Sequence, residues 1–224
     1  MAQRDDWPAG VILAGGRSRR MGGSDKALKA LAGRPMLEHV IERIAPQVGA
    51  LALSVESATP ALARYGLPQL VDPRPGHRGP LGGLLAAVRH FAGSAGWLLL
   101  VPCDAPFLPR NLAARLQACA DEAGAKAAVV LFEGELQPTF SLWNLGLLPL
   151  LEQAAGSGRQ GGFKPVLRAV GAVRCEWRAT DAADAGPGPG ATGAPPPFFN
   201  VNDPADLRCA SRWLGAEGTG VRAC

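Results

Sequence analysis

Short apolar runs alternate with amphipathic segments along most of the chain. The run from Trp97 to Val101 is continuously apolar, which is typical of a central parallel strand covered on both faces. In Met36 to Ala45, apolar residues recur at helical spacing. Patterns of these kinds predict strands at 11–14, 51–55, 69–71, 97–101, 127–132, 136–143 and 172–177, and helices at 36–45, 81–91, 111–123, 145–155, 163–170 and 204–214.

The alternation of strands and helices predicts an α/β domain with a mostly parallel central sheet. The runs at 127–132 and 136–143 are separated only by Glu-Gly-Glu, so we expect them to form a hairpin. In an open α/β sheet, ligands bind at the carboxyl ends of the strands. Candidate functional residues are therefore those that follow predicted strands.

The alternation is interrupted between Asp181 and Pro197, a segment made only of Ala, Gly, Pro, Asp and Thr. Such a composition cannot bury enough apolar surface to offset the entropy of ordering the chain. We therefore expect residues 181–197 to be a disordered surface insertion. Residues 215–224 have the composition of a polar tail, and residues 1–224 are expected to form a single domain.

Composition narrows the classes of function. No apolar run approaches the roughly 18 residues that span a bilayer, and the first ten residues lack the apolar segment of a secretion signal. We therefore expect a cytoplasmic protein without a membrane partner. The formal net charge is +4 and the pI is about 9.0, but basic residues do not interleave with aromatic ones, which argues against nucleic-acid binding.

The cysteine pattern gives no indication of a disulfide scaffold or a metal site. There are five cysteines, an odd number, and no two have the C-x-x-C spacing. This pattern favours neither a disulfide scaffold nor a zinc site. Reduced thiols are the expectation for a cytoplasmic protein.

The stretch from Val11 to Leu28 carries the strongest chemical signal. Its apolar strand breaks at a glycine pair, and a second pair follows at 22–23. Paired glycines let backbone N–H groups approach an anion closely, and clustered cations supply the charge that a triphosphate needs. An exposed basic turn is the alternative, but it would not require glycine pairs on both sides of three arginines. The cations are Arg17, Arg19, Arg20 and Lys26.

Three further motifs have two interpretations each. Asp104 follows the strand at 97–101, where it could cap a turn or hold Mg²⁺ together with substrate phosphates, and a neighbouring phosphate loop favours the metal. Its neighbour Cys103 is interpreted as a packing residue. Asn200 and Asn202 alternate in FFNVN, which we interpret as a short strand with both amides on one face. The two amides could line a binding site as a polar wall, or they could be satisfied by hydrogen bonds where the chain enters a turn. The small residues of 79–88 suit helix–sheet packing or a nucleotide lying against the backbone.

Taken together, these motifs resemble those of the molybdenum cofactor guanylyltransferases, the MobA family. The resemblance implies a three-layer Rossmann-like nucleotidyltransferase fold. It also implies an enzyme that transfers GMP from Mg²⁺-GTP to the terminal phosphate of molybdenum-molybdopterin and releases pyrophosphate. The segments that carry it are LAGGRSRRMGGSDKAL at 13–28, GPLGG at 79–83, PCDAPFLP at 102–109, QPTFSLWN at 137–144 and FFNVNDPADL at 198–207.

The resemblance also implies roles for individual residues. Ser54 stands where the family commonly has Asn, and the region 159–162 departs from the more basic run expected there. The residues implied in catalysis are Lys26, Asp104 and Arg20, with Asp104 as the metal ligand. Those implied in GTP binding are Leu13, Ala14, Gly15, Gly16, Lys26, Ser54, Asp72 and Asp104. Those implied in molybdopterin binding are Asn200 and Asn202.

Three other functions compete with this one. Sugar-1-phosphate nucleotidyltransferases share the sheet but usually show a G-x-G-T-R-L type loop, which is absent here. Cytidylyltransferases resemble L-A-A-G in the first loop, whereas this chain has Leu13-Ala14-Gly15-Gly16, which favours guanine. A non-catalytic GTP-binding or cofactor-binding paralogue would be expected to lack Lys26 or Asp104, and both are present. The family further implies a monomer that makes transient contacts with molybdenum cofactor chaperones or acceptor enzymes.

Overall fold

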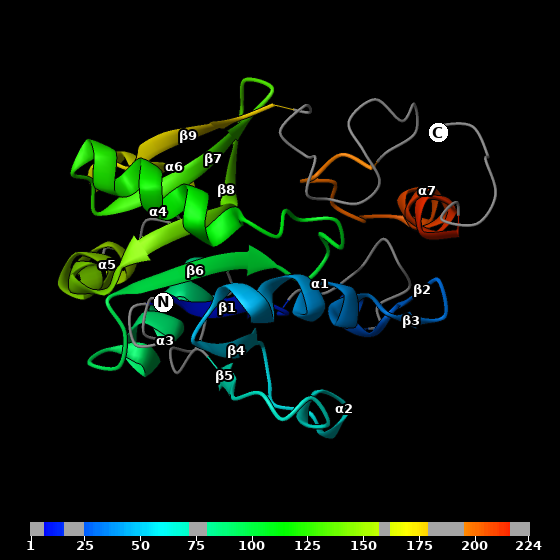
Figure 1. Cartoon of the computed structure of the whole chain (residues 1–224). Helices are drawn as coiled ribbons and strands as arrows, with labels where there is room; N and C mark the ends of the chain where they lie inside the picture. The colour runs from blue at the N-terminus through cyan, green and yellow to red at the C-terminus, as the bar shows by residue number, and fades with distance from the viewer. Residues whose placement is uncertain (1–6, 16–24, 72–79, 157–161, 179–194, 216–224) are drawn as a thin grey trace.

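The computed structural model describes residues 7–15, 25–71, 80–156, 162–178 and 195–215. A seven-stranded sheet in the order β5-β4-β1-β6-β8-β7-β9 forms its centre (Figure 1). The strands are β1 (Ala9–Leu13), β4 (Ala50–Val55), β5 (Gln69–Val71), β6 (Trp97–Pro102), β7 (Ala127–Phe132), β8 (Glu135–Asn144) and β9 (Val173–Trp177). Two short strands, β2 (Ala30–Leu31) and β3 (Arg34–Pro35), pair separately.

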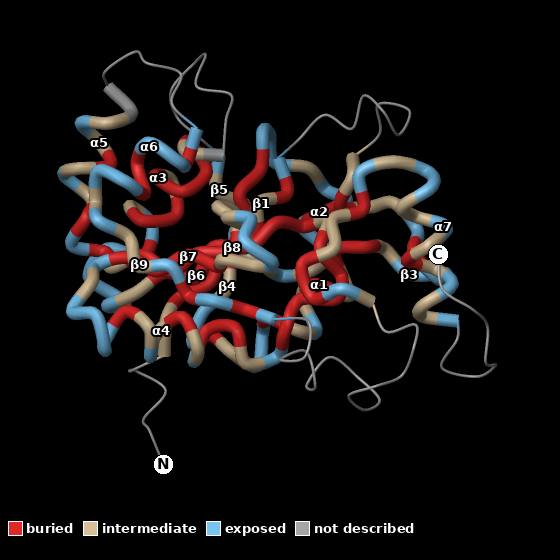
Figure 2. The backbone as a smooth tube through the Cα atoms, turned by 90° about the horizontal axis from the view of Figure 1, so that it is seen from above, coloured by how far each residue is buried: buried red, intermediate tan, exposed pale blue. Residues whose placement is uncertain are grey.

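Helices cover both faces of the sheet, and Figure 2 shows the buried residues concentrated between the layers. On one face lie α3, α5 and α6, and on the other lie α1 and α4. The α-helices are α1 (Met36–Ile44), α2 (Pro60–Ala63), α3 (Pro80–Phe91), α4 (Leu112–Ala123), α5 (Leu148–Gly156), α6 (Phe163–Ala169) and α7 (Pro204–Gly215).

The alternating directions of strand side chains explain this three-layer arrangement. Ile12 of β1 joins the core under α1 and α4, whereas its neighbour Val11 joins the core under α3. On β6, Leu99 and Leu100 divide in the same way, and all of these side chains are fully buried. The predicted central strand covered on both faces is therefore confirmed, as is the α/β class.

The sheet is mostly parallel, with one reversed strand. β1 pairs in parallel with β4 and β6, and β7 with β9, while β8 runs antiparallel between β6 and β7. The hairpin predicted for β7 and β8 is present. Its turn residues Glu133 and Gly134 have φ values of 49° and 80°, the sign that a tight type I′ turn requires at both central positions.

Two local predictions were wrong. Residues 198–202 form irregular backbone and turn instead of a strand, because Val201 donates its N–H to the carbonyl of Asp104 and not to a strand partner. The segment predicted as one helix at 145–155 begins as a 3-10 helix, Leu145–Leu147, before α5. There the side chain of Asn144 accepts a hydrogen bond from the N–H of Gly146 and starts the tighter turn.

The expectation of five reduced thiols was also wrong. Cys119 of α4 and Cys175 of β9 form a disulfide, with their Cα atoms 5.9 Å apart. The two residues are 56 positions apart in sequence, and they meet because α4 packs across β7 and β9. No local spacing could have indicated this pairing, since it depends on which strand stands at the end of the sheet.

Several predictions concern residues outside the described ranges. These are the cationic loop residues Arg17, Arg19 and Arg20, the glycines 16 and 22–23, Asp72, the region 159–161, most of the insertion (181–194) and the tail from 216 onward. Within the ranges that the structure describes, no helix is both long and apolar enough to cross a membrane.

Candidate functional site

The parallel strands β4, β1 and β6 end side by side. In the register of the sheet, Leu13 stands between Ser54 of β4 and Pro102 of β6. The carbonyl of Leu13 accepts the N–H of Cys103 at 3.1 Å, which extends the pairing one residue beyond β6. The next residue along the chain is Asp104, so the sheet itself delivers this carboxylate to the edge where ligands bind in such folds.

The backbone immediately after β1 is also fixed. The N–H groups of Ala14 and Gly15 both donate to the carbonyl of Ser54, at 2.8 and 2.9 Å. These two N–H groups are therefore already satisfied by β4. A Cβ on Gly15 would stand 3.1 Å from the nitrogen of Glu56, so the close approach of the two chains favours glycine here.

Lys26, Asp104 and Asn202 meet at this edge from distant parts of the sequence. The Lys26 ammonium donates to Oδ2 of Asp104 in a salt bridge, and it donates to Oδ1 of Asn202 at 2.8 Å. The side chains of Lys26 and Asp104 are only 15% and 16% exposed. A partly desolvated charge pair with an amide acceptor is thus built from the first loop, the β6 exit and the segment before α7.

The position of Lys26 depends on its neighbour Asp25, which sequence reasoning did not single out. The Asp25 side chain accepts the N–H of Ala27 at 3.1 Å and so caps the short helical turn that carries Lys26. Burial raises the pKa of the Asp25 carboxyl, and the hydrogen bond from Ala27 partly opposes that shift. An Asp directly before the lysine is the sequence signal that could have indicated this cap.

A second capping arrangement holds the Asn200–Asn202 segment. Asp203 accepts the N–H groups of Ala205 and Asp206 at 2.7 and 2.9 Å, and Asp206 returns the interaction by accepting the N–H of Asp203 at 3.2 Å. The Asp206 carboxylate also accepts the N–H of Asn202 at 2.8 Å. This reciprocal pattern is a capping box at the start of α7, and the D-P-A-D sequence is a recognisable variant of its signature. The N–H of Val201 donates to the carbonyl of Asp104 at 2.8 Å. This bond and the capping box together place Asn202 against Lys26.

In the described ranges, two side-chain oxygens at this site are buried without a hydrogen-bond partner, namely Oδ1 of Asp104 and Oδ1 of Asn200. Buried polar oxygens are nearly always satisfied in proteins, so each indicates a ligand, an ion or a water. Carboxylate and amide oxygens are also suitable ligands for Mg²⁺. Among the described residues, no three His, Cys, Asp or Glu side chains form a metal-binding cluster.

Cys103 lies beside this site without the properties of a nucleophile. Burial raises the pKa of its thiol far above the usual range, and the negative charge of Asp104 adds to the shift, while Lys26 opposes it. The protonated thiol is a poor nucleophile. The interpretation of Cys103 as a packing residue is supported.

Ser54 contacts the entry of α3. Its side chain is buried, and a Cβ on Gly83 would stand 2.3 Å from its Oγ and 2.9 Å from Cδ2 of Leu13. Gly83 therefore lets α3 pack directly onto the ends of β1 and β4. Of the two interpretations of the small residues at 79–88, close helix–sheet packing is the one that these contacts support.

The structure therefore forms two adjoining groups from the predicted residues. Leu13, Ala14, Gly15 and Ser54 lie together at the ends of β1 and β4, and Lys26, Asp104 and Asn202 lie together at the end of β6, with Asn200 in the same segment. Leu13 joins the groups through its bond to Cys103. Arg20, Gly16 and Asp72 lie outside the described residues.

Comparison with known proteins identifies the family of this chain. The sequence profile of the MobA-like NTP transferase domain matches residues 10–190. A molybdenum cofactor guanylyltransferase from Rhizobium meliloti (strain 1021) is 38% identical over 211 residues, covering 93% of this chain and 92% of that protein. One from Acidiphilium cryptum (strain JF-5) is 41% identical over 204 residues, covering 89% and 92%.

A solved structure shares the fold. The molybdopterin-guanine dinucleotide biosynthesis protein A of Archaeoglobus fulgidus superposes with a TM-score of 0.69 at 23% identity, covering 92% of this chain and 98% of that one. The matched profile spans most of the sequence, including the ends of β1, β4 and β6. The chain is thus a member of the MobA-like NTP transferase family.

Proposed function

We propose that this enzyme transfers GMP from GTP to the terminal phosphate of molybdenum-molybdopterin, which gives the molybdopterin guanine dinucleotide cofactor and pyrophosphate. The names of its relatives support this substrate pair. The observation that carries the proposal is the convergence of Lys26, Asp104 and Asn202 at one edge of the sheet. This arrangement places a cation, an anion and an amide from three separate motifs around one point.

In this reaction, an oxygen of the molybdopterin phosphate attacks the α-phosphorus of GTP. The bond between the α-phosphorus and the bridging oxygen to the β-phosphate breaks, and pyrophosphate leaves. No covalent enzyme intermediate is needed, so the protein accelerates the reaction by holding two anions together and neutralising the charge that develops between them.

The charge pair fixes the position of the Lys26 ammonium at the end of β6. Lys26 is held by Asp104 and Asn202, and we propose that its ammonium turns to the triphosphate when GTP binds. Arg20 would act beside it. We propose that Asn202 and Asn200 then contact the molybdopterin, because their segment meets Lys26 and Asp104 from the side of α7.

We propose Mg²⁺ as the metal, with Asp104 as its protein ligand. The unpartnered buried Oδ1 of Asp104 fits an oxygen-ligated cation, and substrate phosphates commonly complete the shell of Mg²⁺. When bound, such an ion would supply positive charge to the α-phosphate. The protein's own contribution is to hold the carboxylate at the end of β6 through the bonds from Cys103 and Val201.

We propose that the nucleotide lies over the ends of β1 and β4. Leu13, Ala14, Gly15 and Gly16 would contact it through their backbone, with Ser54 and Asp72 at its side. Since the N–H groups of Ala14 and Gly15 already bond to Ser54 and the carbonyl of Leu13 accepts from Cys103, we propose that the carbonyl groups of Ala14 and Gly15 accept hydrogen bonds from the base. Guanine presents N–H donors along its Watson–Crick edge, which suits such acceptors.

We further infer that the protein works as a monomer in the cytoplasm, where GTP is available, and that it hands its product to other proteins through transient contacts with cofactor chaperones or acceptor enzymes.

Nucleotide choice is the test of this function. Purified protein should release pyrophosphate from Mg²⁺-GTP only when molybdopterin is supplied, and the product should carry guanine by mass spectrometry. Equal turnover with CTP would overturn the guanine assignment. Binding of GTP without pyrophosphate release under any condition would indicate a non-catalytic paralogue instead.

A further inference from the structure

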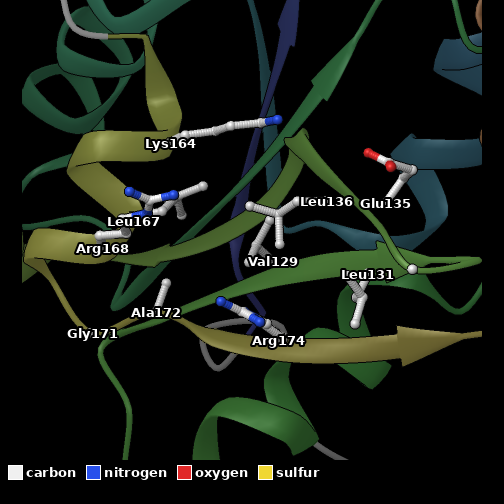
Figure 3. Close-up of a pocket in the computed structure, with 11 residues that line it drawn as sticks. Val129, Leu131, Glu135, Leu136, Lys164, Leu167, Arg168, Gly171, Ala172 and Arg174 are labelled. Carbon is white, nitrogen blue, oxygen red and sulfur yellow. The ribbon is translucent and has the colours of Figure 1, made fainter.

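A separate cavity lies on the α6 side of the sheet, toward its β9 end. Its volume is about 380 Å³, and its walls come from α6, β7, the β7–β8 turn and the start of β9 (Figure 3). None of the residues proposed for the transfer reaction lines it. We call it the α6 groove; it is lined by Val129, Leu131, Gly134, Glu135, Leu136, Lys164, Leu167, Arg168, Gly171, Ala172 and Arg174.

The α6 groove has a cationic rim. Lys164 and Arg168 stand four positions apart on α6, so they share one face of that helix, and Arg174 rises from β9. All three side chains are exposed, and within the described ranges none of them forms an ion pair or hydrogen bond. Glu135 is the one carboxylate among the lining residues. The rim therefore favours an anionic ligand.

The floor of the groove is apolar. Val129 and Leu167 belong to the core under α6, and Leu131, Leu136 and Ala172 are only half-buried. These partly exposed side chains lie below the cations in a position to contact an apolar group. Exposed apolar surface rimmed by charged residues is a common feature of protein interaction sites.

The charges are spread along the groove and do not converge. In Figure 3 the ammonium of Lys164 and the guanidinium groups of Arg168 and Arg174 point to separate places, and the carboxylate of Glu135 stands apart from all three. This spread suits an extended ligand with several negative charges, whose apolar groups would be directed to the floor, better than a single phosphate.

We propose that the α6 groove is a docking site for an extended acidic segment of a partner protein, in which carboxylates alternate with apolar side chains. In an extended chain, successive side chains point in opposite directions, so carboxylates would meet the rim while apolar groups meet the floor. In the part of the chain that the structure describes, β9 is the last strand of the sheet and pairs only with β7, so the groove lies at an edge of the sheet. The inference does not depend on the identity of the transferred nucleotide.

The binding test uses the full chain and a fluorescein-labelled nonapeptide in which Asp alternates with Leu or Val, followed by fluorescence anisotropy. We expect saturable binding that weakens as salt rises. Arg168→Glu and Arg174→Glu should each weaken it by about 5- to 30-fold, because each reversal removes an attraction and adds a repulsion. The matched control is Arg208→Glu, an exposed arginine on α7, and it should change the Kd by less than about twofold.

Four results would overturn the proposal. The first is the absence of saturable binding, and the second is an equal loss for Arg208→Glu and Arg168→Glu, which would show attraction to net charge alone. The third is equal affinity for a peptide with Ser in place of Leu and Val, because the floor would then contribute nothing. The fourth is stoichiometric displacement by pyrophosphate, GTP or molybdopterin, which would assign the groove to a small anion.

Activity provides the independent readout. With free substrates, Arg168→Glu should release pyrophosphate at the rate of the unmodified enzyme. A loss of rate equal to its loss of peptide affinity would place the groove in the transfer site and overturn the docking role. Since peptide binding and pyrophosphate release are measured separately, failure of the proposed transferase function would leave the binding result intact.

Discussion

Replacing Asp104 with Asn changes one charge at the centre of the candidate site and almost nothing else. The amide has nearly the same shape as the carboxylate, and its oxygen could still accept a hydrogen bond from Lys26. What the variant loses is the negative charge that holds the ammonium and that we propose to bind the metal. Asp104→Asn therefore separates the contribution of that charge to stability from its contribution to the reaction.

The two contributions differ in size. The Lys26 and Asp104 side chains are 15% and 16% exposed, so their pairing is stronger than a surface ion pair, which is worth about 0–1 kcal/mol, and weaker than a fully buried one, whose disruption costs about 3–5 kcal/mol. We expect the free energy of unfolding to fall by about 1–3 kcal/mol. A domain with a total of about 5–15 kcal/mol stays folded after such a loss.

The effect on the reaction should be larger. Removing one group that stabilises developing charge costs about 10²- to 10³-fold in rate, and loss of the metal's protein ligand should reach the upper end, which corresponds to about 4 kcal/mol. Pyrophosphate release with Mg²⁺-GTP and molybdopterin measures the rate, and urea unfolding followed by circular dichroism measures stability. A variant that keeps more than about a tenth of the normal rate at saturating Mg²⁺ would remove Asp104 from the metal role.

Three other predictions follow from the same contacts. Asn202→Ala removes the amide that we propose to contact the molybdopterin, and because a hydrogen bond to a charged group contributes about 1.5–3 kcal/mol, kcat/KM for molybdopterin should fall by about 10- to 100-fold; an unchanged value would contradict the proposed contact. Gly83→Ala places a methyl group 2.3 Å from Oγ of Ser54, so overpacking of about 1–3 kcal/mol should outweigh the gain of about 1 kcal/mol in helix propensity; urea unfolding measures the difference, and a stabilised variant would contradict it. Because burial raises the pKa of the Cys103 thiol, iodoacetamide at pH 8.5 should leave this residue unmodified in the folded, metal-free protein and modify it in urea, as mass spectrometry would show; rapid modification of the folded protein would contradict its burial.

Much of the fold could be predicted because it follows from local patterns. The continuous apolar run of β6 and the helical spacing in α1 and α4 reflect which side chains each element must bury. These patterns involve residues that are close in sequence, so they can be recognised without the structure. The chemical identities of the candidate site were visible for the same reason. Lys26 and Asp104 stand in short motifs next to strand ends, and parallel strand ends meet at one edge of a sheet.

Long-range pairing could not be read in this way. The sequence patterns predict the β7–β8 hairpin, but they do not reveal that β8 pairs with β6 or that β9 stands at the end of the sheet, and the Cys119–Cys175 disulfide depends on that placement. The segment around Val201 has the alternation of a strand, yet its N–H bonds to Asp104 because the aromatic contacts of Phe198 and the capping box of α7 hold it there.

The sequence by itself therefore determined the class of fold and the types of side chain available for chemistry. The tertiary structure decided which of them meet. Asn202 lies 176 positions from Lys26, and their contact exists only because the end of β1, the exit of β6 and the start of α7 are packed together. The α6 groove also depends on the tertiary structure, since α6 and β9 are neighbours in the sequence but β7 and its turn to β8 are brought to them by the parallel pairing of β7 with β9.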